Sequence, residues 1–257
     1  MTSFDTAEHR VGTHIHLDRS RWRIVSKVNE HVFPFDREDA ETFDIRPYVC
    51  ARFRVRKVQQ GPQEEAFMRV YKQIPILGSE FNTAEEIARQ AKPQVPTEVK
   101  AFQRFSSLHL SPDCTPTLLD SRTEQQGDGD RVPGGFIYTI IWSIVPGIRL
   151  GDDLGSQTFW NLPREERDLI RAEFRDKLPA LYSCGYIPYV GATQNLVWDG
   201  TGRRLYFVGW LNCLPLRPND IDLPFSPMRW ASWGLAAAPR IPFPSPTWQG
   251  SIDSWEL

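Results

Sequence analysis

Four residues of the chain carry side chains that could take part in phosphate or metal chemistry: Lys72, Glu98, Asn195 and Asp199. An ammonium group binds phosphate, and amide and carboxylate oxygens are ligands that Mg²⁺ accepts. Each signal is weak when taken alone, because a lysine on a strand and a glutamate on a helix are common. Asp199 precedes a glycine, which favours a turn residue over a metal ligand. The sequence contains none of the local motifs of serine hydrolases, zinc peptidases, P-loop NTPases or dinucleotide-binding enzymes.

The elements that would position the first two residues can be predicted from hydrophobic patterning. Tyr48 to Val58 alternates apolar residues with arginines, which is typical of a half-buried antiparallel strand. Ala66 to Ile74 follows a Gly-Pro turn and predicts the second strand of a hairpin, on which Lys72 lies. Pro96 to Phe105 predicts a helix with a proline in its first turn, and Glu98 lies near its start.

The second half of the chain predicts a buried strand, a long helix and a hairpin. Phe136 to Val145 is the most hydrophobic run and contains Trp142. Asn161 to Cys184 has apolar residues at helical spacing, with Asn161 expected as its N-cap. Asn195 to Trp198 and Arg204 to Val208 are short strand-like runs joined by Asp-Gly-Thr-Gly, which predicts a hairpin turn.

The remaining segments give weaker signals. Trp22 to Val28 predicts a strand, Asn29 to Arg46 reads as a connector and Ser121 to Arg131 as a surface loop. The Pro-rich tail after Leu211 allows one short helix, at about Arg229 to Ala238.

This order of elements, with the phrases NLVWD and LYFVGW at its end, resembles the protein kinase-like superfamily and especially the small degenerate kinase-like proteins of fungi. The resemblance covers roughly residues 48 to 211 and includes Pro-x-Leu-Leu-Asp after the 96–105 helix. It implies an α+β, two-lobed fold. The small lobe would be an antiparallel sheet within residues 1–145, which include an N-terminal extension. Residues 146–257 would form a truncated, mostly helical second lobe with a Pro/Trp-rich tail.

The resemblance also assigns roles to individual residues. Lys72 matches the strand lysine that holds nucleotide phosphates, Glu98 its ion-pair partner, and Asn195 the metal-binding asparagine of the catalytic loop. Lys72 and Glu98 are therefore expected to approach each other. The candidate residues of the cleft between the lobes are Lys72, Glu98, Trp142, Asn195, Trp198 and Trp210.

Three parts of the phosphotransfer machinery are missing. An active kinase has a Gly-rich loop before the first of these strands, but no glycine lies between Gly12 and Gly61. Val190 stands at the position of the catalytic Asp, and Gly209 replaces the metal-binding Asp. Trp210, beside Gly209, is expected to fill part of the phosphate volume or to form the wall of an apolar pocket. We therefore predict weak or absent Mg-ATP binding, and no metal or other cofactor.

Three hypotheses about function follow. The first is a kinase-like pseudoenzyme that binds a small molecule or a protein partner in the cleft between the lobes without transferring phosphate. The second is a metal-free biosynthetic enzyme of secondary metabolism, of the cyclase or isomerase type, that folds a hydrophobic substrate in an aromatic-walled cleft. The third is a residual ATP-dependent phosphotransferase. The three missing parts argue against the third hypothesis, and the sequence alone does not separate the first two.

Composition limits the class of partner. The chain is 40% hydrophobic and 24% charged, and its net charge of −2 gives no general attraction to nucleic acid or anionic lipid. No run approaches transmembrane length, and the four cysteines are scattered without a CxxC motif. We therefore expect a cytoplasmic protein that binds neither nucleic acid nor membrane.

Overall fold

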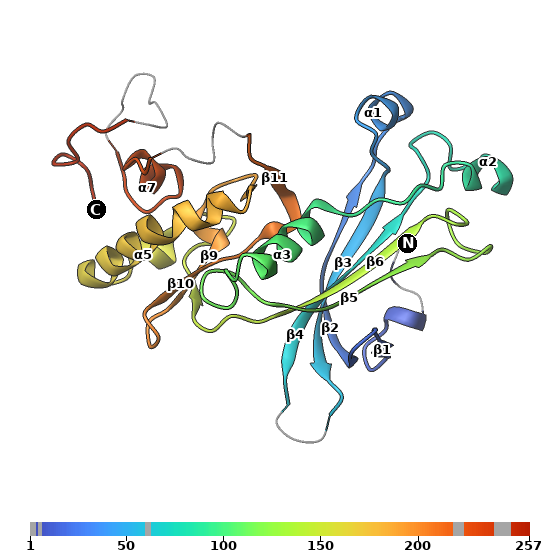
Figure 1. Cartoon of the computed structure of the whole chain (residues 1–257), viewed down its shortest axis with the longest axis horizontal. Coiled ribbons are helices and arrows are strands. Elements are labelled where there is room, and N and C mark those ends of the chain that lie inside the picture. The colour runs from blue at the N-terminus through green and yellow to red at the C-terminus, as the bar shows by residue number, and fades with distance from the viewer. Residues whose placement is uncertain (1–3, 5–6, 60–62, 218–223, 239–247) are drawn as a thin grey trace. The chain divides into compact units, whose positions relative to one another are not determined.

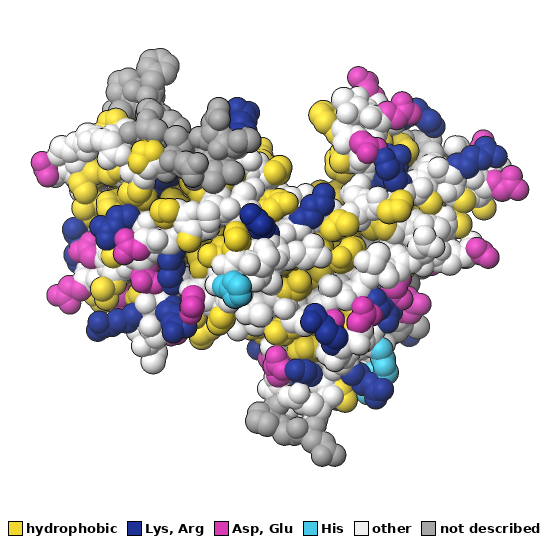
Figure 2. Space-filling view, in the orientation of Figure 1, with side chains coloured by type: hydrophobic (Ala, Val, Ile, Leu, Met, Phe, Trp, Pro, Cys, Tyr) yellow, Lys and Arg dark blue, Asp and Glu magenta, His cyan; other side chains and the backbone are white. Residues whose placement is uncertain are grey.

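The computed structural model describes residues 4, 7–59, 63–217, 224–238 and 248–257. The architecture is mixed α+β (Figure 1), and the chain forms two compact units. The first comprises Met1–Pro96 and Leu118–Ile144, and the second comprises Thr97–Thr117 and Val145–Leu257. Within the described ranges, no helix is both long enough and apolar enough to cross a lipid bilayer. On the face that Figure 2 shows, basic and acidic side chains are interspersed.

The first unit is built on a six-stranded antiparallel sheet with the order β1-β2-β3-β4-β6-β5. Its strands are β1 (His14–His16), β2 (Arg21–Phe33), β3 (Tyr48–Lys57), β4 (Glu65–Gln73), β5 (Leu118–Gln125) and β6 (Phe136–Ser143). The three segments that sequence patterning predicted to share one sheet are the consecutive strands β3, β4 and β6. That prediction is confirmed.

The sheet curls, and side-chain hydrogen bonds tie its first part to its last strand (Figure 1). The Asp120 carboxylate on β5 accepts a hydrogen bond of 2.5 Å from Ser20 Oγ and one of 3.1 Å from the backbone N–H of Arg19. Arg122, also on β5, donates to the carbonyl of His16 on β1. The hydrophobic core lies inside the curl and consists of Phe4, Trp22, Ile24, Val49, Ala51, Phe53, Val55, Ala66, Met68, Val70 and Ile141.

Three short helical segments complete the first unit: η1 (Ala7–His9), α1 (Arg37–Thr42) and α2 (Ala84–Ala88). The Asp36 side chain caps the N-terminus of α1, and Thr83 with Glu86 forms a capping box on α2. Such short helices are stable only where caps and tertiary packing support them.

Two sequence predictions in the first unit were wrong. The predicted strand at 22–28 extends to Phe33, because irregularities in the β2–β3 register allow pairing to continue to Phe33 opposite Tyr48. The predicted connector at 29–46 therefore contains the end of β2 and also α1. The predicted loop at 121–131 contains most of β5. The side chains of this part of β5 are polar, so its sequence resembles that of a loop.

The second unit contains the helices α3 (Thr97–Ser107), α4 (Gln157–Trp160), α5 (Arg164–Ser183) and α7 (Met228–Ser232). Its strands form two small sheets, β10-β9-β7 and β11-β8. These are β7 (Ile148–Arg149), β8 (Tyr186–Pro188), β9 (Leu196–Asp199), β10 (Arg204–Phe207) and β11 (Cys213–Pro215), with the 3-10 turns η2 (Thr193–Asn195) and η3 (Trp210–Asn212). The predicted hairpin is confirmed by the pairing of β9 with β10.

Two details of the second unit differ from the sequence predictions. The long helix α5 begins at Arg164 after an N-cap position held by Pro163, so the predicted Asn161 cap was wrong. Helix α3 was expected in the first 145 residues as part of the small lobe, but it groups with the second unit. Aromatic packing accounts for this grouping, since the ring centroids of Phe105 on α3 and Trp210 are 4.4 Å apart.

Candidate functional site

The side chain of Asn195 stabilises the loop between β8 and β9 through a hydrogen bond. Its Nδ2 donates a hydrogen bond of 2.8 Å to the carbonyl of Val190, and its backbone carbonyl accepts one of 2.8 Å from Val208. The resemblance aligned Asn195 with a metal-binding asparagine and Val190 with the catalytic base. In this structure the amide closes a loop.

Gly209 lies against Oδ1 of the Asn195 side-chain amide. It adopts a left-handed conformation with φ of 80°, which favours glycine. A Cβ placed on Gly209 would lie 2.0 Å from Asn195 Oδ1. The space that an aspartate would need at position 209 is therefore occupied by the Asn195 side chain. Val190, Asn195 and Gly209 therefore lie together. The resemblance aligns them with the catalytic base, the metal-binding Asn and the metal-binding Asp, but here they contact one another.

The two tryptophans that were predicted for this half of the site are buried in the second unit. Trp198 on β9 donates its indole N–H to Glu166 of α5 at 2.8 Å. Trp210 is 2% exposed and donates its N–H to the carbonyl of Phe207 at 3.1 Å. Both rings thus have hydrogen-bond partners and packed surroundings, which are features of structural residues.

Lys72 and Trp142 belong to the first unit and lie on opposite faces of its sheet. The Lys72 ammonium lies 5.9 Å from the centroid of the Phe4 ring, inside the curl. Trp142 pairs with Phe67 across β6 and β4, and their ring centroids are 6.0 Å apart. Because side chains alternate along β4, Phe67 and Lys72 point to different faces.

The predicted pairing of Lys72 with Glu98 stays a prediction. Glu98 is buried in α3 of the second unit, at 2% exposure. Lys72 forms an ion pair within its own unit, in which its Nζ lies 3.6 Å from Oε2 of Glu8.

Lys72 lines a cavity of about 500 Å³ within the first unit, which we call the curl cavity. Segments that contribute to it include η1, β1, β4, β5 and β6, so it is built from strands that are far apart in the sequence. Its apolar wall consists of Ile15, Leu17, Val70 and Ile137. Its charged and polar groups include Glu8, His9, Lys72, Arg122, Glu124 and Thr139.

The electrostatics of the curl cavity depend on two cations and a neutral imidazole. Burial, helped by the charges of Lys72 and Lys27, lowers the pKa of His9 from 6.5 to about 4. His9 is therefore neutral at pH 7. The Arg122 guanidinium is paired with Glu124 at 2.5 Å, and it also donates to the carbonyl of His16. Its Nε is buried and has no hydrogen-bond partner among the described residues.

Sequence reasoning identified only Lys72 of this group. The alternation of Ala66, Met68 and Val70 with Lys72 places the lysine on an apolar face, and that signal was available. Glu8 and His9 come from the N-terminal extension, whose packing no local pattern predicts. Arg122 lies in the segment that was interpreted as a loop.

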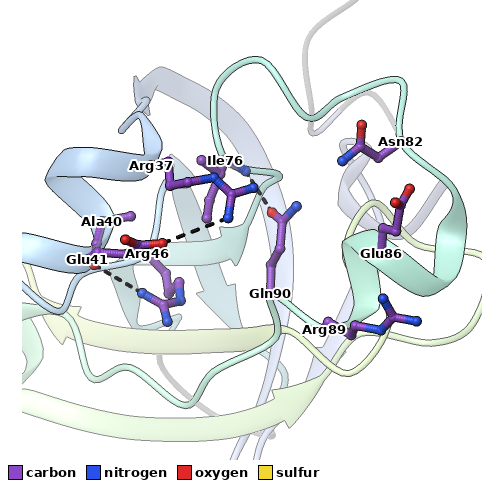
Figure 3. A pocket seen from close by; sticks show the side chains of 9 residues that line it. All are labelled: Arg37, Ala40, Glu41, Arg46, Ile76, Asn82, Glu86, Arg89 and Gln90. Carbon is purple, nitrogen blue, oxygen red and sulfur yellow. Dashed lines mark hydrogen bonds and ion pairs between the residues drawn. The ribbon is translucent and has the colours of Figure 1, made fainter.

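A second hollow, of about 370 Å³, lies between α1 and α2 (Figure 3). Figure 3 shows Arg37 beside Glu41 on the α1 side, and Glu86 and Arg89 on the α2 side. The Arg37–Glu41 pair is exposed, and Glu86 is engaged with Thr83 in the capping box. The polar groups of this hollow mainly stabilise local structure.

No protein-family profile and no curated protein matches the chain. Among solved structures, it is similar to the crystal structure of the BubR1 kinase domain, with a TM-score of 0.42 and 10% sequence identity. The match covers 82% of this chain and 53% of that one, so the chain spans about half the length of the kinase domain it matches. The chain is thus structurally similar to a kinase domain, at low sequence identity.

Proposed function

We propose that the protein is a kinase-like pseudoenzyme, of the degenerate kind that its sequence resembles in fungi. In this proposal it binds a small-molecule ligand or a protein partner, and it does not transfer phosphate. The single observation that carries the proposal is the contact between Asn195 and Gly209.

Phosphoryl transfer requires Mg²⁺ held by carboxylate and amide oxygens and a group that orients the nucleophile. Gly209 has no carboxylate, and Val190 has no group that accepts a proton. The Asn195 amide donates to the Val190 carbonyl, and its Oδ1 fills the space beside Gly209. An aspartate at 209 would therefore have to displace Asn195, so metal binding could not be restored by that substitution alone.

The test measures nucleotide binding and transfer separately. Calorimetry with Mg-ATP should show no binding in the micromolar range, and radiolabelled ATP should label neither the protein nor generic acceptor proteins. The same measurements on Val190→Asp/Gly209→Asp should also be negative, because the second aspartate meets Asn195. Micromolar, Mg-dependent ATP binding by the wild-type protein would contradict the proposal.

A further inference from the structure

We infer that the curl cavity is a binding site for an organic monocarboxylate with an apolar body. The inference rests on the ligand-binding role proposed above and gives that role a site and a ligand class.

The first argument is the incomplete pairing of the Lys72 ammonium. The Lys72 side chain is only 12% exposed, and among the described residues its one ion pair is with Glu8 at 3.6 Å. That separation is too long for a hydrogen bond, so the three N–H donors of the ammonium have no close acceptor there. A mostly buried charge is costly unless it is paired and hydrogen-bonded. A ligand carboxylate at Lys72 would supply acceptors that the described residues do not provide.

The second argument is the buried Nε of Arg122. The other two nitrogens of this guanidinium are engaged by His16 and Glu124, whereas Nε has no partner among the described residues. An orphaned buried donor is destabilising, and an acceptor on a ligand would satisfy it once the Arg122 side chain shifts to expose Nε. Lys72 and Arg122 both line the curl cavity, from β4 and β5.

Carboxylates outnumber cations in the cavity, so its charge balance disfavours a ligand with more than one negative charge. Lys72 and Arg122 face the carboxylates of Glu8 and Glu124, and Asp130 also lines the cavity. The Glu8 side chain is 74% exposed and only loosely paired, so it can move into water when a ligand binds. A monocarboxylate would then take its place at Lys72 without changing the net charge. A nucleotide or an inorganic phosphate would add negative charge beside Glu124 and Asp130.

The apolar wall indicates the rest of the ligand. Ile15, Leu17, Val70 and Ile137 line the cavity beside the charged groups. The cavity volume lies within the roughly 300–1,000 Å³ that is typical of small-molecule sites, and most of its other lining residues are polar or charged. A short aliphatic or aromatic acid fits both the volume and the mixture of groups.

The experiment titrates the full chain with decanoate at pH 7.5 by calorimetry, below the concentration at which decanoate forms micelles. Decanol, inorganic phosphate and Mg-ATP are the comparison ligands. Decanoate should bind at least about tenfold more tightly than decanol, which corresponds to ~1.4 kcal/mol. Lys72→Met should lose that preference. Glu8→Gln should bind decanoate severalfold more tightly, because the competing carboxylate is removed.

Lys57→Met is the matched control, since Lys57 lies on β3 and is paired with Glu64 at 2.8 Å, and it does not line the cavity. It should bind decanoate as the wild type does. Absence of decanoate binding, equal affinity for decanol, or unchanged affinity in Glu8→Gln would each overturn the inference. Glu8→Gln is on the surface and carries the test even if Lys72→Met does not fold. None of these outcomes changes the Mg-ATP result, so the two proposals fail separately.

Discussion

Gly209 and Gly185 adopt almost the same backbone conformation, with φ of 80° and 79°, but only Gly209 is crowded. A Cβ on Gly185 would meet no atom within 4 Å, whereas one on Gly209 would meet the Asn195 amide. Gly185→Ala should therefore cost only the strain of the left-handed conformation, about 1–2 kcal/mol. Gly209→Ala should cost at least ~1 kcal/mol more, because Asn195 must move.

The two variants and a double mutant can be compared by urea denaturation. Gly209→Ala combined with Asn195→Ala should be less destabilised than the sum of the single variants, since the second substitution removes the clash. Equal losses for Gly185→Ala and Gly209→Ala, or strict additivity in the double mutant, would show that Asn195 does not occupy the space at 209. The argument for a closed metal position would then fail.

The site at Lys72 shows which part of a binding site the sequence can reveal. Alternation along β4 was enough to predict that Lys72 shares a face with Val70. The carboxylate that forms an ion pair with it, Glu8, is more than sixty positions away along the chain, and no periodicity connects the two. Residues that meet only through tertiary structure give no local signal, and for this reason the cavity was not predicted.

Strand β5 closes the curled sheet through Asp120, and this contact can be tested by one substitution. Asp120 is 1% exposed and accepts hydrogen bonds from Ser20 Oγ, from the backbone N–H of Arg19 and from that of Ser121. Asp120→Asn replaces one acceptor oxygen with an NH₂ group that faces donors. The free energy of unfolding at pH 7 should fall by about 1–3 kcal/mol. Asp128→Asn, at an exposed position in the next loop, should change little.

The pH dependence of this contact has a defined sign. Burial tends to raise the pKa of Asp120, but the hydrogen bonds from Ser20, Arg19 and Ser121 outweigh it, and the net pKa is lowered from 3.8. A carboxyl whose folded pKa is lowered stabilises the protein above its unfolded pKa, and this stabilisation is lost as pH falls through the folded value. The stability difference between wild type and Asp120→Asn should therefore shrink below about pH 4. A difference that is constant from pH 7 to pH 3 would contradict the role of the ionised carboxylate.

The elements that sequence patterning predicted well are those with one apolar and one polar face. Strands β3 and β4 alternate clearly, and the β9–β10 hairpin has a glycine-rich turn. Strand β5 was not recognised beyond its first residues, because Arg122 and Glu124 point into a cavity rather than a core. A strand whose inner face is polar has the composition of a loop, and only its partner β6 identifies it.

At the scale of the whole molecule, the chain passes between its two units more than once. The sequence placed a boundary at residue 145, but residues 97–117 belong to the second unit and 118–144 return to the first. The three-residue spacing of Val99, Phe102 and Phe105 is typical of a helix with an apolar face, but such spacing does not show which elements cover that face. In the structure, Val99, Phe102 and Phe105 are at most 1% exposed, and Phe105 packs on Trp210.

This division predicts how fragments of the protein behave. A fragment of residues 1–144 contains α3 but lacks Trp210 and the rest of the second unit. Its apolar helix face should be exposed, and the fragment should associate through it, because large exposed apolar patches promote association. A fragment in which a Gly/Ser linker of equal length replaces residues 97–117 should keep all six strands and run closer to its monomer mass in size-exclusion chromatography.

The control isolates the apolar face from the other effects of truncation. Phe102→Ser/Phe105→Ser in the 1–144 fragment keeps the chain length and removes the two largest apolar side chains of α3. This variant should recover the monomer fraction of the linker fragment, because both lack the same exposed rings. Circular dichroism should show comparable strand content in all three fragments, since β1 to β6 are present in each. If the unsubstituted 1–144 fragment is as monomeric as the linker fragment, α3 does not need the second unit to cover its apolar face, and the grouping of residues 97–117 with that unit has no energetic basis.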